Sequence, residues 1–207
     1  SVGDFYADGY NGPVLSQDLT NDYGKILKIG ISDGSYKIFS IGHRNPQGLF
    51  VDKSNNIFST EHGPDGGDEI NLIFQDKNYG WPVATFGTAY GKKMWPIDKT
   101  NNTHSNFEKP IFSWGNIFGI SNLIIYEDDF FTKWNNNLIV STLASKQLVR
   151  LVFDRKKKSI IYIEYIPIGK RIRDIIKLDN GKLVLLTDKG IKIEDGPQII
   201  LIDKYGN

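Results

Sequence analysis

The sequence predicts an all-β protein that forms part of a β-propeller. Apolar segments of strand length recur along the 207 residues with turn residues between them, and no long stretch shows helical periodicity. These segments fall into four-stranded units that repeat every ~40–50 residues, which is typical of propeller blades that cover one another's faces. The chain therefore holds about three and a half blades, fewer than the four or more of most propellers.

Each predicted strand is a short apolar run that ends at a polar or glycine-rich turn. Leu49–Asp52 and Ile57–Thr60, for example, flank the polar turn Lys53–Asn56, which predicts an antiparallel hairpin. The predicted strands are Lys25–Ile31, Tyr36–Ile41, Gln47–Val51, Ile57–Thr60, Glu69–Phe74, Pro110–Trp114, Asn122–Tyr126, Leu138–Thr142, Leu148–Phe153, Ser159–Ile166, Arg173–Leu178, Leu183–Thr187 and Gln198–Ile202.

The segment Gln75–Lys109 contains no predicted strand and is rich in glycine, asparagine, proline and aromatic residues. A loop of this length in a compact domain is usually functional or disordered, and the aromatic residues favour an ordered cap. We predict one partial propeller domain over residues 1–207, with residues 75–109 as a long loop insertion. The charge run Arg155–Lys158 is expected at a solvated hairpin tip, because like charges avoid burial.

Composition narrows the functional classes. A formal net charge of +1 gives no reason to expect a nucleic-acid partner, and the absence of cysteine excludes disulfides and thiolate metal sites. No stretch approaches the ~20 consecutive apolar residues of a membrane span. The opening residues Ser1–Asp4 lack the features of a signal peptide and resemble the end of a strand, so we expect a chain truncated on its amino-terminal side.

Two polar clusters flank the predicted hairpin. His43–Leu49 precedes its first strand, and Glu61–Asn71 follows its second. An antiparallel hairpin brings both clusters to the same end of a sheet. Arginine, asparagine, glutamine, histidine and carboxylates gather there around Gly-Pro, and we interpret this end as the rim of a binding site.

The second cluster contains oxygen ligands for a hard cation. Asp65, Asp68 and Glu69 stand close to Gly63-Pro64, and calcium takes about six to eight oxygens from carboxylates and backbone carbonyls. Glycines allow the sharp turns that make carbonyls converge. The spacing of an EF-hand is absent. A tight turn whose carboxylates cap backbone amides explains the same residues equally well.

Cationic and amide side chains suggest an anionic ligand. Arg44, Asn45 and Gln47 suit a carboxylate- or quinone-bearing ligand, since guanidinium pairs with flat oxyanions in bidentate fashion. Arg171 and Arg173 fall on the same side of a predicted strand. Their like charges repel one another unless a bound anion or the neighbouring Asp174 lies between them, so ligand binding and structural ion pairing both remain open.

The histidines offer a third interpretation. His43 and His62, with Glu61, could ligate a transition metal, but a hydrolytic zinc site normally has three ligands at a characteristic spacing plus a base. His104 lies in the long loop without such spacing. We therefore favour hydrogen bonding in the rim for His43 and His62.

Three motifs stand in order along the chain: Gly42–Leu49, then Glu61–Pro64 with Gly67–Ile73, then Asn78–Pro82. They resemble the soluble glucose/sorbosone dehydrogenase family. The branch most similar is that of bacterial aldose sugar dehydrogenases, which use pyrroloquinoline quinone (PQQ). Weaker similarity continues as far as Asp174, so the resemblance covers most of the chain.

The resemblance implies a six-bladed propeller that binds PQQ and calcium. It implies that the carbonyl oxygens of Gly63 and Pro64 hold the calcium that anchors PQQ. Arg44 and Asn45 would face the quinone oxygens, with Gln47 supporting them.

The same resemblance assigns two further groups of residues. Arg171 and Arg173 would meet the carboxylates of the cofactor. Asp68, Glu69 and Tyr79 would form a possible second, structural calcium site.

The implied activity is oxidation of an aldose at its anomeric carbon, with hydride transfer to PQQ and later delivery of electrons to an acceptor. Arg44 would stabilise charge, whereas the family's histidine base belongs to an upstream His-x-Gly-Gly segment that this sequence lacks. We therefore expect this chain alone to be inactive. The implied location is periplasmic or extracellular. Open blade faces predict self-association. The alternative is a non-catalytic extracellular propeller that binds carbohydrate or protein.

Overall fold

A computed structural model describes residues 1–10, 12–101, 103–189 and 196–204 of the chain. The chain divides into two compact units, Ser1–Ile117 and Phe118–Asn207. The prediction of one domain over the whole chain stays a prediction. Within the described ranges, no helix is long and apolar enough to cross a membrane.

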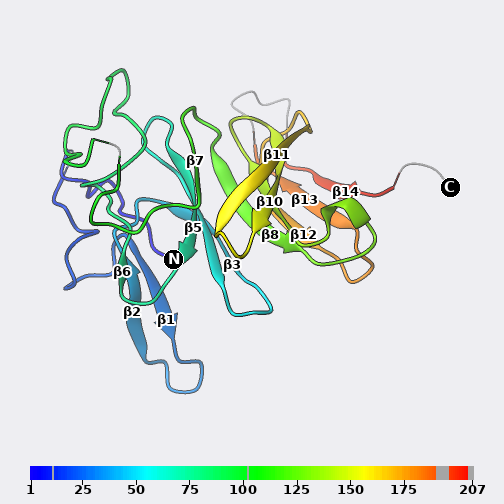
Figure 1. Ribbon diagram of the computed structural model, residues 1–207, viewed down its shortest axis with the longest axis horizontal. Helices are drawn as coiled ribbons and strands as arrows, with labels where there is room; N and C mark the ends of the chain where they lie inside the picture. Colours follow the sequence, from blue (N-terminus) through cyan, green and yellow to red (C-terminus); the bar gives the residue numbers. More distant parts are fainter. Residues whose placement is uncertain (11, 102, 190–195, 205–207) are drawn as a thin grey trace. The chain divides into compact units, whose positions relative to one another are not determined.

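The first unit contains two sheets (Figure 1). One has the order β1-β2-β6, in which β1 and β2 are antiparallel and β2 and β6 are parallel. The other is an antiparallel sheet of order β3-β4-β5-β7. The strands are β1 (Lys25–Ile29), β2 (Tyr36–Ile41), β3 (Pro46–Val51), β4 (Ile57–Glu61), β5 (Asp68–Ile73), β6 (Lys77–Asn78) and β7 (Phe112–Trp114).

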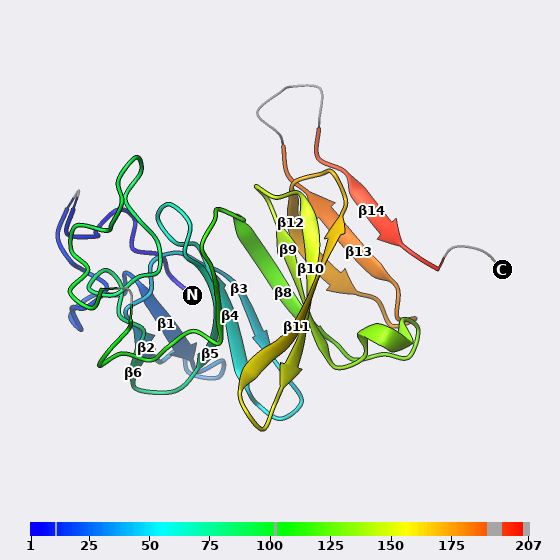
Figure 2. The ribbon, with the colours of Figure 1, turned by 45° about the horizontal axis from the view of Figure 1, so that its top comes forward.

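The second unit also contains two sheets, and Figure 2 shows them side by side. Their orders are β11-β10-β9-β8 and β12-β13-β14. The Tyr126 hydroxyl donates to the Gly181 carbonyl at 2.7 Å, and the Ser121 hydroxyl donates to the Ile172 carbonyl at 2.6 Å, which ties the two sheets together. The strands are β8 (Ile120–Tyr126), β9 (Asn137–Thr142), β10 (Gln147–Asp154), β11 (Ser159–Pro167), β12 (Ile172–Lys177), β13 (Leu183–Thr187) and β14 (Ile199–Ile202).

The all-β prediction is confirmed. Every predicted strand occurs, with ends within two residues of the predicted ones. The described residues form four sheets, two with four strands and two with three, which agrees with about three and a half blades. Sequence analysis missed β6 and the short 3₁₀ helix Thr132–Trp134, both too brief to produce a periodic pattern. The run Arg155–Lys158 joins β10 to β11 and is exposed, as predicted.

The long insertion is ordered around a core of its own. Trp81, Ala89 and Trp95 are buried together, and Ile97 packs against them. The rings of Trp81 and Trp95 lie 4.8 Å apart. This aromatic core fixes Trp81, whose ring packs against the Arg44 guanidinium.

Strand β5 is unusual because all six of its residues are buried although three of them are polar. Asp68, Glu69 and Asn71 therefore face protein rather than water. Buried polar groups need partners, so these side chains indicate a polar interior at the end of this sheet.

Candidate functional site

A buried hydrogen-bonded chain lies beneath the predicted rim. The Ser40 hydroxyl and His43 Nε2 are joined at 2.8 Å, and His43 Nδ1 and Glu61 Oε2 at 2.9 Å. The order matches that of a Ser-His-acid hydrolase triad. Ser40 is only 1% exposed, however, so no substrate reaches it. The hydrogen-bond network of Ser40, His43 and Glu61 therefore orients neighbouring groups and does not perform nucleophilic chemistry.

The same geometry decides the zinc interpretation. Both ring nitrogens of His43 are engaged by protein groups, so His43 has no nitrogen left for a metal. Among the residues that the structure describes, no three histidine, cysteine or carboxylate side chains converge as metal ligands. The preference for a hydrogen-bonded His43 is confirmed, although the residue lies under the rim and not on it.

Three contacts fix the position of Arg44. Its backbone amide donates to Glu61 Oε1, and its Nη1 donates to the His62 carbonyl at 3.2 Å. Its guanidinium carbon stands 5.4 Å from the centre of the Trp81 ring, within cation–π range. The register that pairs Pro46 with Glu61 across β3 and β4 brings these groups together, as the hairpin argument predicted.

Asn45 and Gln47 follow Arg44 in the same loop. The Asn45 carbonyl accepts from the His62 amide at 3.1 Å, which closes the rim between the two clusters. The Gln47 amide donates to Asn45 Oδ1 at 2.9 Å. Gln47 therefore orients the Asn45 side chain.

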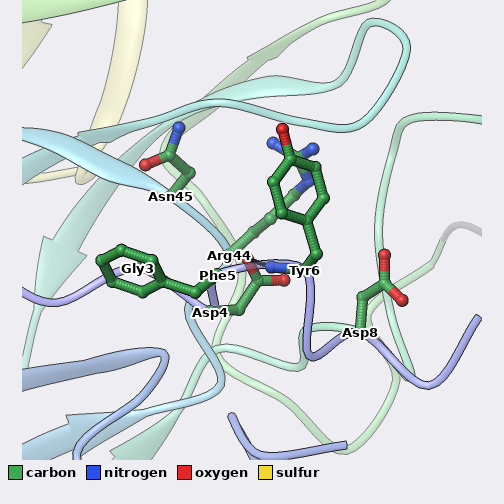
Figure 3. A pocket seen from close by; sticks show the side chains of 7 residues that line it. All are labelled: Gly3, Asp4, Phe5, Tyr6, Asp8, Arg44 and Asn45. Carbon is green, nitrogen blue, oxygen red and sulfur yellow. Dashed lines mark hydrogen bonds between the residues drawn. The ribbon is translucent and has the colours of Figure 1, made fainter. Parts of the chain in front are cut away.

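Arg44 lines two cavities. The outer cavity has a volume of about 230 Å³. Figure 3 shows that its walls come from the amino-terminal segment and from the loop before β3. Its lining residues are Gly3, Asp4, Phe5, Tyr6, Asp8, Arg44 and Asn45.

The inner cavity has a volume of about 10 Å³, enough for roughly one water or one small ion. Its walls combine two carboxylates with several glycines and backbone segments. Its lining residues are Gly42, Arg44, Glu61, His62, Gly63, Gly67, Glu69, Tyr79, Trp81, Ala84 and Thr85.

The Gly63–Gly67 loop requires glycine at its close approaches. A Cβ on Gly63 would lie 2.0 Å from the Gly66 carbonyl oxygen, so no larger residue fits. Gly66 and Gly67 both have φ of 70°, the left-handed region that favours glycine. The Gly63 amide donates to Asp68 Oδ1 at 3.1 Å. Gly63 lines the inner cavity, whereas the Pro64 ring is buried against Gly87.

Glu69 is the most perturbed acid of the site. Burial raises the pKa of its carboxyl well above the usual range, and the charge of Glu61 raises it further. The Asn71 amide donates to Glu69 Oε2 at 3.3 Å, and His104 Nε2 lies 3.6 Å from Glu69 Oε1. Two carboxylates beside a small cavity would be stabilised by a cation between them or by a proton.

Two further residues complete this region. The Tyr79 hydroxyl donates to the Leu72 carbonyl at 2.6 Å and accepts from the Phe74 amide at 2.9 Å, so Tyr79 could bind a cation only through its backbone oxygen. His104 stacks on Phe86 at 4.4 Å, and burial lowers the pKa of its imidazole. Its contact with Glu69 was not foreseen, because nothing in the spacing of the long loop points to it.

In the second unit, Arg171 and Arg173 converge on Asp188. Arg173 Nη2 donates to Asp188 Oδ2 at 2.5 Å, and Arg171 Nη2 lies 3.8 Å from the same oxygen. The hydrogen bond from Arg173 lowers the pKa of Asp188. The sequence left a bound anion and Asp174 open as the group beside the two arginines. The structure places Asp188 there, while the Asp174 carboxylate accepts from the Asn122 side-chain amide and the Ile175 backbone amide.

Arg171 has one further hydrogen-bond donor, its Nε. Its Nε is buried and has no hydrogen-bond partner within the described residues. A buried unsatisfied donor is costly unless an acceptor arrives. In the part of the chain that the structure describes, the contact seen for this pair of arginines is the ion pairing with Asp188.

The comparisons with known proteins show the family to which this chain belongs. The sequence profile of the family described as "Glucose / Sorbosone dehydrogenase" matches residues 1–194. The chain belongs to the glucose/sorbosone dehydrogenase family. The family resemblance and the β-propeller class of fold are thereby confirmed.

Members of the glucose/sorbosone dehydrogenase family similar to this chain include two curated proteins. Aldose sugar dehydrogenase YliI of Escherichia coli (strain K12) is 33% identical over 84% of this chain and 50% of its own length. Quinoprotein glucose dehydrogenase B of Acinetobacter calcoaceticus is 27% identical over 92% of this chain and 54% of its own length. The chain thus spans about half the length of these relatives.

A solved structure gives the same result. The soluble aldose sugar dehydrogenase from Escherichia coli, in its apo-form, has a TM-score of 0.81 and 30% identity. The similarity covers 91% of this chain and 57% of that one.

Proposed function

We propose that this chain forms the cofactor-facing part of a quinoprotein sugar dehydrogenase, which oxidises an aldose at its anomeric carbon with PQQ as the hydride acceptor. The observation that carries the proposal is the position of Arg44 between two cavities. The outer cavity has space for a small polar substrate, and the inner one has space for a single ion. The names of the relatives, aldose sugar dehydrogenase and quinoprotein glucose dehydrogenase, support the same reaction class.

The residues present fit an anionic quinone and a cation. The partly exposed guanidinium groups of Arg171 and Arg173 carry positive charge that suits an anionic ligand. The carboxylates of Glu61 and Glu69 beside the inner cavity would be stabilised by a positive charge. We propose that Gly63 and Pro64 hold calcium through their carbonyl oxygens. We further propose that Arg171 and Arg173 bind the carboxylates of PQQ. Asp68, Glu69 and the Tyr79 backbone oxygen form the proposed second calcium site.

When bound, PQQ and calcium supply the two-electron acceptor and its polarisation. The protein contributes charge stabilisation and orientation. Arg44 is held by Glu61, the His62 carbonyl and Trp81, so its guanidinium is preorganised to stabilise negative charge that develops on an oxygen. Asn45, oriented by Gln47, adds an amide next to it.

The oxidation removes a hydride from the anomeric carbon and a proton from its hydroxyl, which leaves a lactone. His43 does not take this proton, because it is fully buried and both of its nitrogens are engaged. His104 is likewise buried, against Phe86. We assign no base among the residues described, and we propose a periplasmic or extracellular location for the enzyme with a separate electron acceptor.

The test is a titration of PQQ in the presence of calcium, followed by the quinone absorbance. Arg44→Ala and Arg173→Ala are each expected to weaken binding at least tenfold, because a hydrogen bond to a charged group contributes about 1.5–3 kcal/mol. Arg155→Ala, on the exposed β10–β11 hairpin, is the matched control and should bind within twofold of the wild type.

Unchanged PQQ affinity in both test variants, or no binding by the wild type, would favour the alternative of a non-catalytic binding propeller. Self-association is tested separately by light scattering. A clean monomer at high concentration would refute it.

A further inference from the structure

Strands β12 and β13 bring two cations and one carboxylate together at one end of a sheet in the second unit. Arg171 and Arg173 stand at the start of β12, and Asp188 directly follows β13. The two strands are antiparallel neighbours, with Ile172 opposite Thr187 (Figure 2). This pairing explains why Asp188, and not a residue closer in the sequence, meets the two arginines.

The backbone holds the Asp188 carboxylate in place. The Asp188 amide donates to the Arg171 carbonyl at 2.7 Å, and Asp188 Oδ1 accepts from the Lys189 amide at 2.8 Å. The other carboxylate oxygen, Oδ2, meets the arginines. The arginine side chains are the longer and more flexible partners. When a ligand arrives, the guanidinium groups can therefore turn towards it while Asp188 stays in place.

The two arginines share one oxygen of this carboxylate. Nη2 of Arg173 lies 2.5 Å from Asp188 Oδ2, and Nη2 of Arg171 lies 3.8 Å from the same atom. A carboxylate that lies opposite a single guanidinium can form a fork of two parallel hydrogen bonds, which is a stronger arrangement. A ligand carboxylate that forms such a fork can compete with Asp188.

Exposure also makes the pairing easy to displace. The Arg173 side chain is 47% exposed and that of Asp188 is 31% exposed, so water screens their attraction. Exposed ion pairs shift an equilibrium by no more than about fivefold. Two guanidinium groups against one carboxylate leave a positive charge, and Lys170 and Lys189 adjoin the cluster along the chain. The ligand class that suits this cluster is a planar carboxylate.

Asp188 opposes the binding of such a ligand in two ways. Its pairing occupies guanidinium groups that the ligand needs, and the apparent affinity of a ligand falls with the fraction of sites that are free to bind. Its negative charge also repels a ligand carboxylate bound next to it. Without a ligand, the same charge offsets the repulsion between the two arginines.

We infer that Asp188 is an internal counter-ion that competes with the ligand carboxylates for Arg171 and Arg173 and so limits how tightly the ligand is held. This inference rests on the proposed binding of PQQ by these arginines and identifies the residue that sets its strength. Asp188 keeps the arginine pair together while the site is empty and yields the pair to an incoming carboxylate.

The experiment measures the binding of two anions to the full 207-residue chain. PQQ with calcium is titrated by absorbance. Phthalate, a small planar dicarboxylate, is titrated without calcium by NMR of the arginine side-chain N–H groups. The test variant is Asp188→Asn. Asp203→Asn is the matched control, because Asp203 forms an exposed ion pair with Lys182 in the same unit.

We expect Asp188→Asn to bind both PQQ and phthalate about three- to tenfold more tightly than the wild type, since it removes the pairing and the repulsion together. Asp203→Asn should stay within about twofold of the wild type for both anions. A double variant, Asp188→Asn with Arg173→Ala, should bind no more tightly than Arg173→Ala alone, because the gain acts through the arginine pair. A merely structural role would instead weaken binding in Asp188→Asn.

The other results decide against the inference or separate it from the proposed function. Equal or weaker binding of both anions by Asp188→Asn overturns the counter-ion role, as does a gain that persists in the double variant. It is also overturned if no chain binds phthalate at about 100 mM, a concentration that would reveal even millimolar affinity. If Asp188→Asn gains affinity for phthalate but no chain binds PQQ, the proposed dehydrogenase function fails and the counter-ion role stands.

Discussion

Replacing Glu61 by alanine tests whether a buried carboxylate holds the rim together. Glu61 accepts from the Arg44 backbone amide and bonds to His43 Nδ1, and it is almost fully buried. Each buried polar group left without a partner costs about 1–3 kcal/mol. Removing the charge also relieves repulsion with Glu69, which offsets part of the loss. A net loss of about 3 kcal/mol should lower Tm by roughly 6–12 °C in a chain of this size.

Tryptophan fluorescence is the suitable assay, because Trp81, Trp95 and Trp114 all belong to the first unit. Glu61→Gln keeps one acceptor oxygen and should lose only about 1 kcal/mol. Glu164→Ala is the control: its carboxylate pairs with Arg150 at 2.6 Å but is 41% exposed, so the loss should stay below about 1 kcal/mol. A Tm for Glu61→Ala within 2 °C of the wild type would refute the reasoning.

Three further predictions follow from the structure. Calcium should raise the Tm of the wild type more than that of Glu69→Gln, because the variant loses a ligand of the proposed second site and keeps the proposed Gly63–Pro64 site; equal shifts would rule out Glu69 as a ligand. Lys25→Met should destabilise the first unit by at least ~3 kcal/mol in urea denaturation, since the buried Lys25 ammonium donates to three carbonyls that would lose their donor; a loss below 1 kcal/mol would contradict this. Asp188→Asn should lower stability by up to ~1 kcal/mol at pH 7. Because Arg173 lowers the pKa of Asp188 in the folded state, this contribution is complete above the ordinary pKa near ~3.9 and disappears as pH falls through the lowered value. A loss that stays constant as the pH is lowered below ~3.9 would therefore contradict the pairing.

The rim was predictable because its geometry follows from local patterns. An apolar run, a polar turn and a second apolar run specify the β3–β4 hairpin, and its register places Arg44 beside Glu61 and His62. The Gly63–Gly67 loop was also visible, since glycines mark close backbone approach. These features depend on residues near one another in the sequence.

Contacts between distant segments were not predictable in this way. Asp188 lies just beyond the end of β13, and the antiparallel pairing of β12 with β13 brings it to Arg173. The sequence made Asp174 the nearer candidate because it is adjacent along the chain. The link from Asp4 to Trp81 spans 77 positions and carries no periodic signal.

The Phe5–Tyr6 turn shows how local preference and site geometry conflict. Phe5 and Tyr6 have φ of 51° and 66°. Nothing in Asp-Phe-Tyr-Ala predicts two consecutive left-handed residues, and turn preferences argue against them. Trp81 stabilises the turn through two contacts. Its indole donates to Asp4, and its ring packs against the Arg44 guanidinium. Trp81 is itself fixed by the aromatic core of the long insertion. The insertion therefore supports the outer cavity through the contacts of Trp81 with Asp4 and Arg44. A protein with a shorter insertion would lose the hydrogen bond that anchors the turn and one of the contacts that hold Arg44 in place.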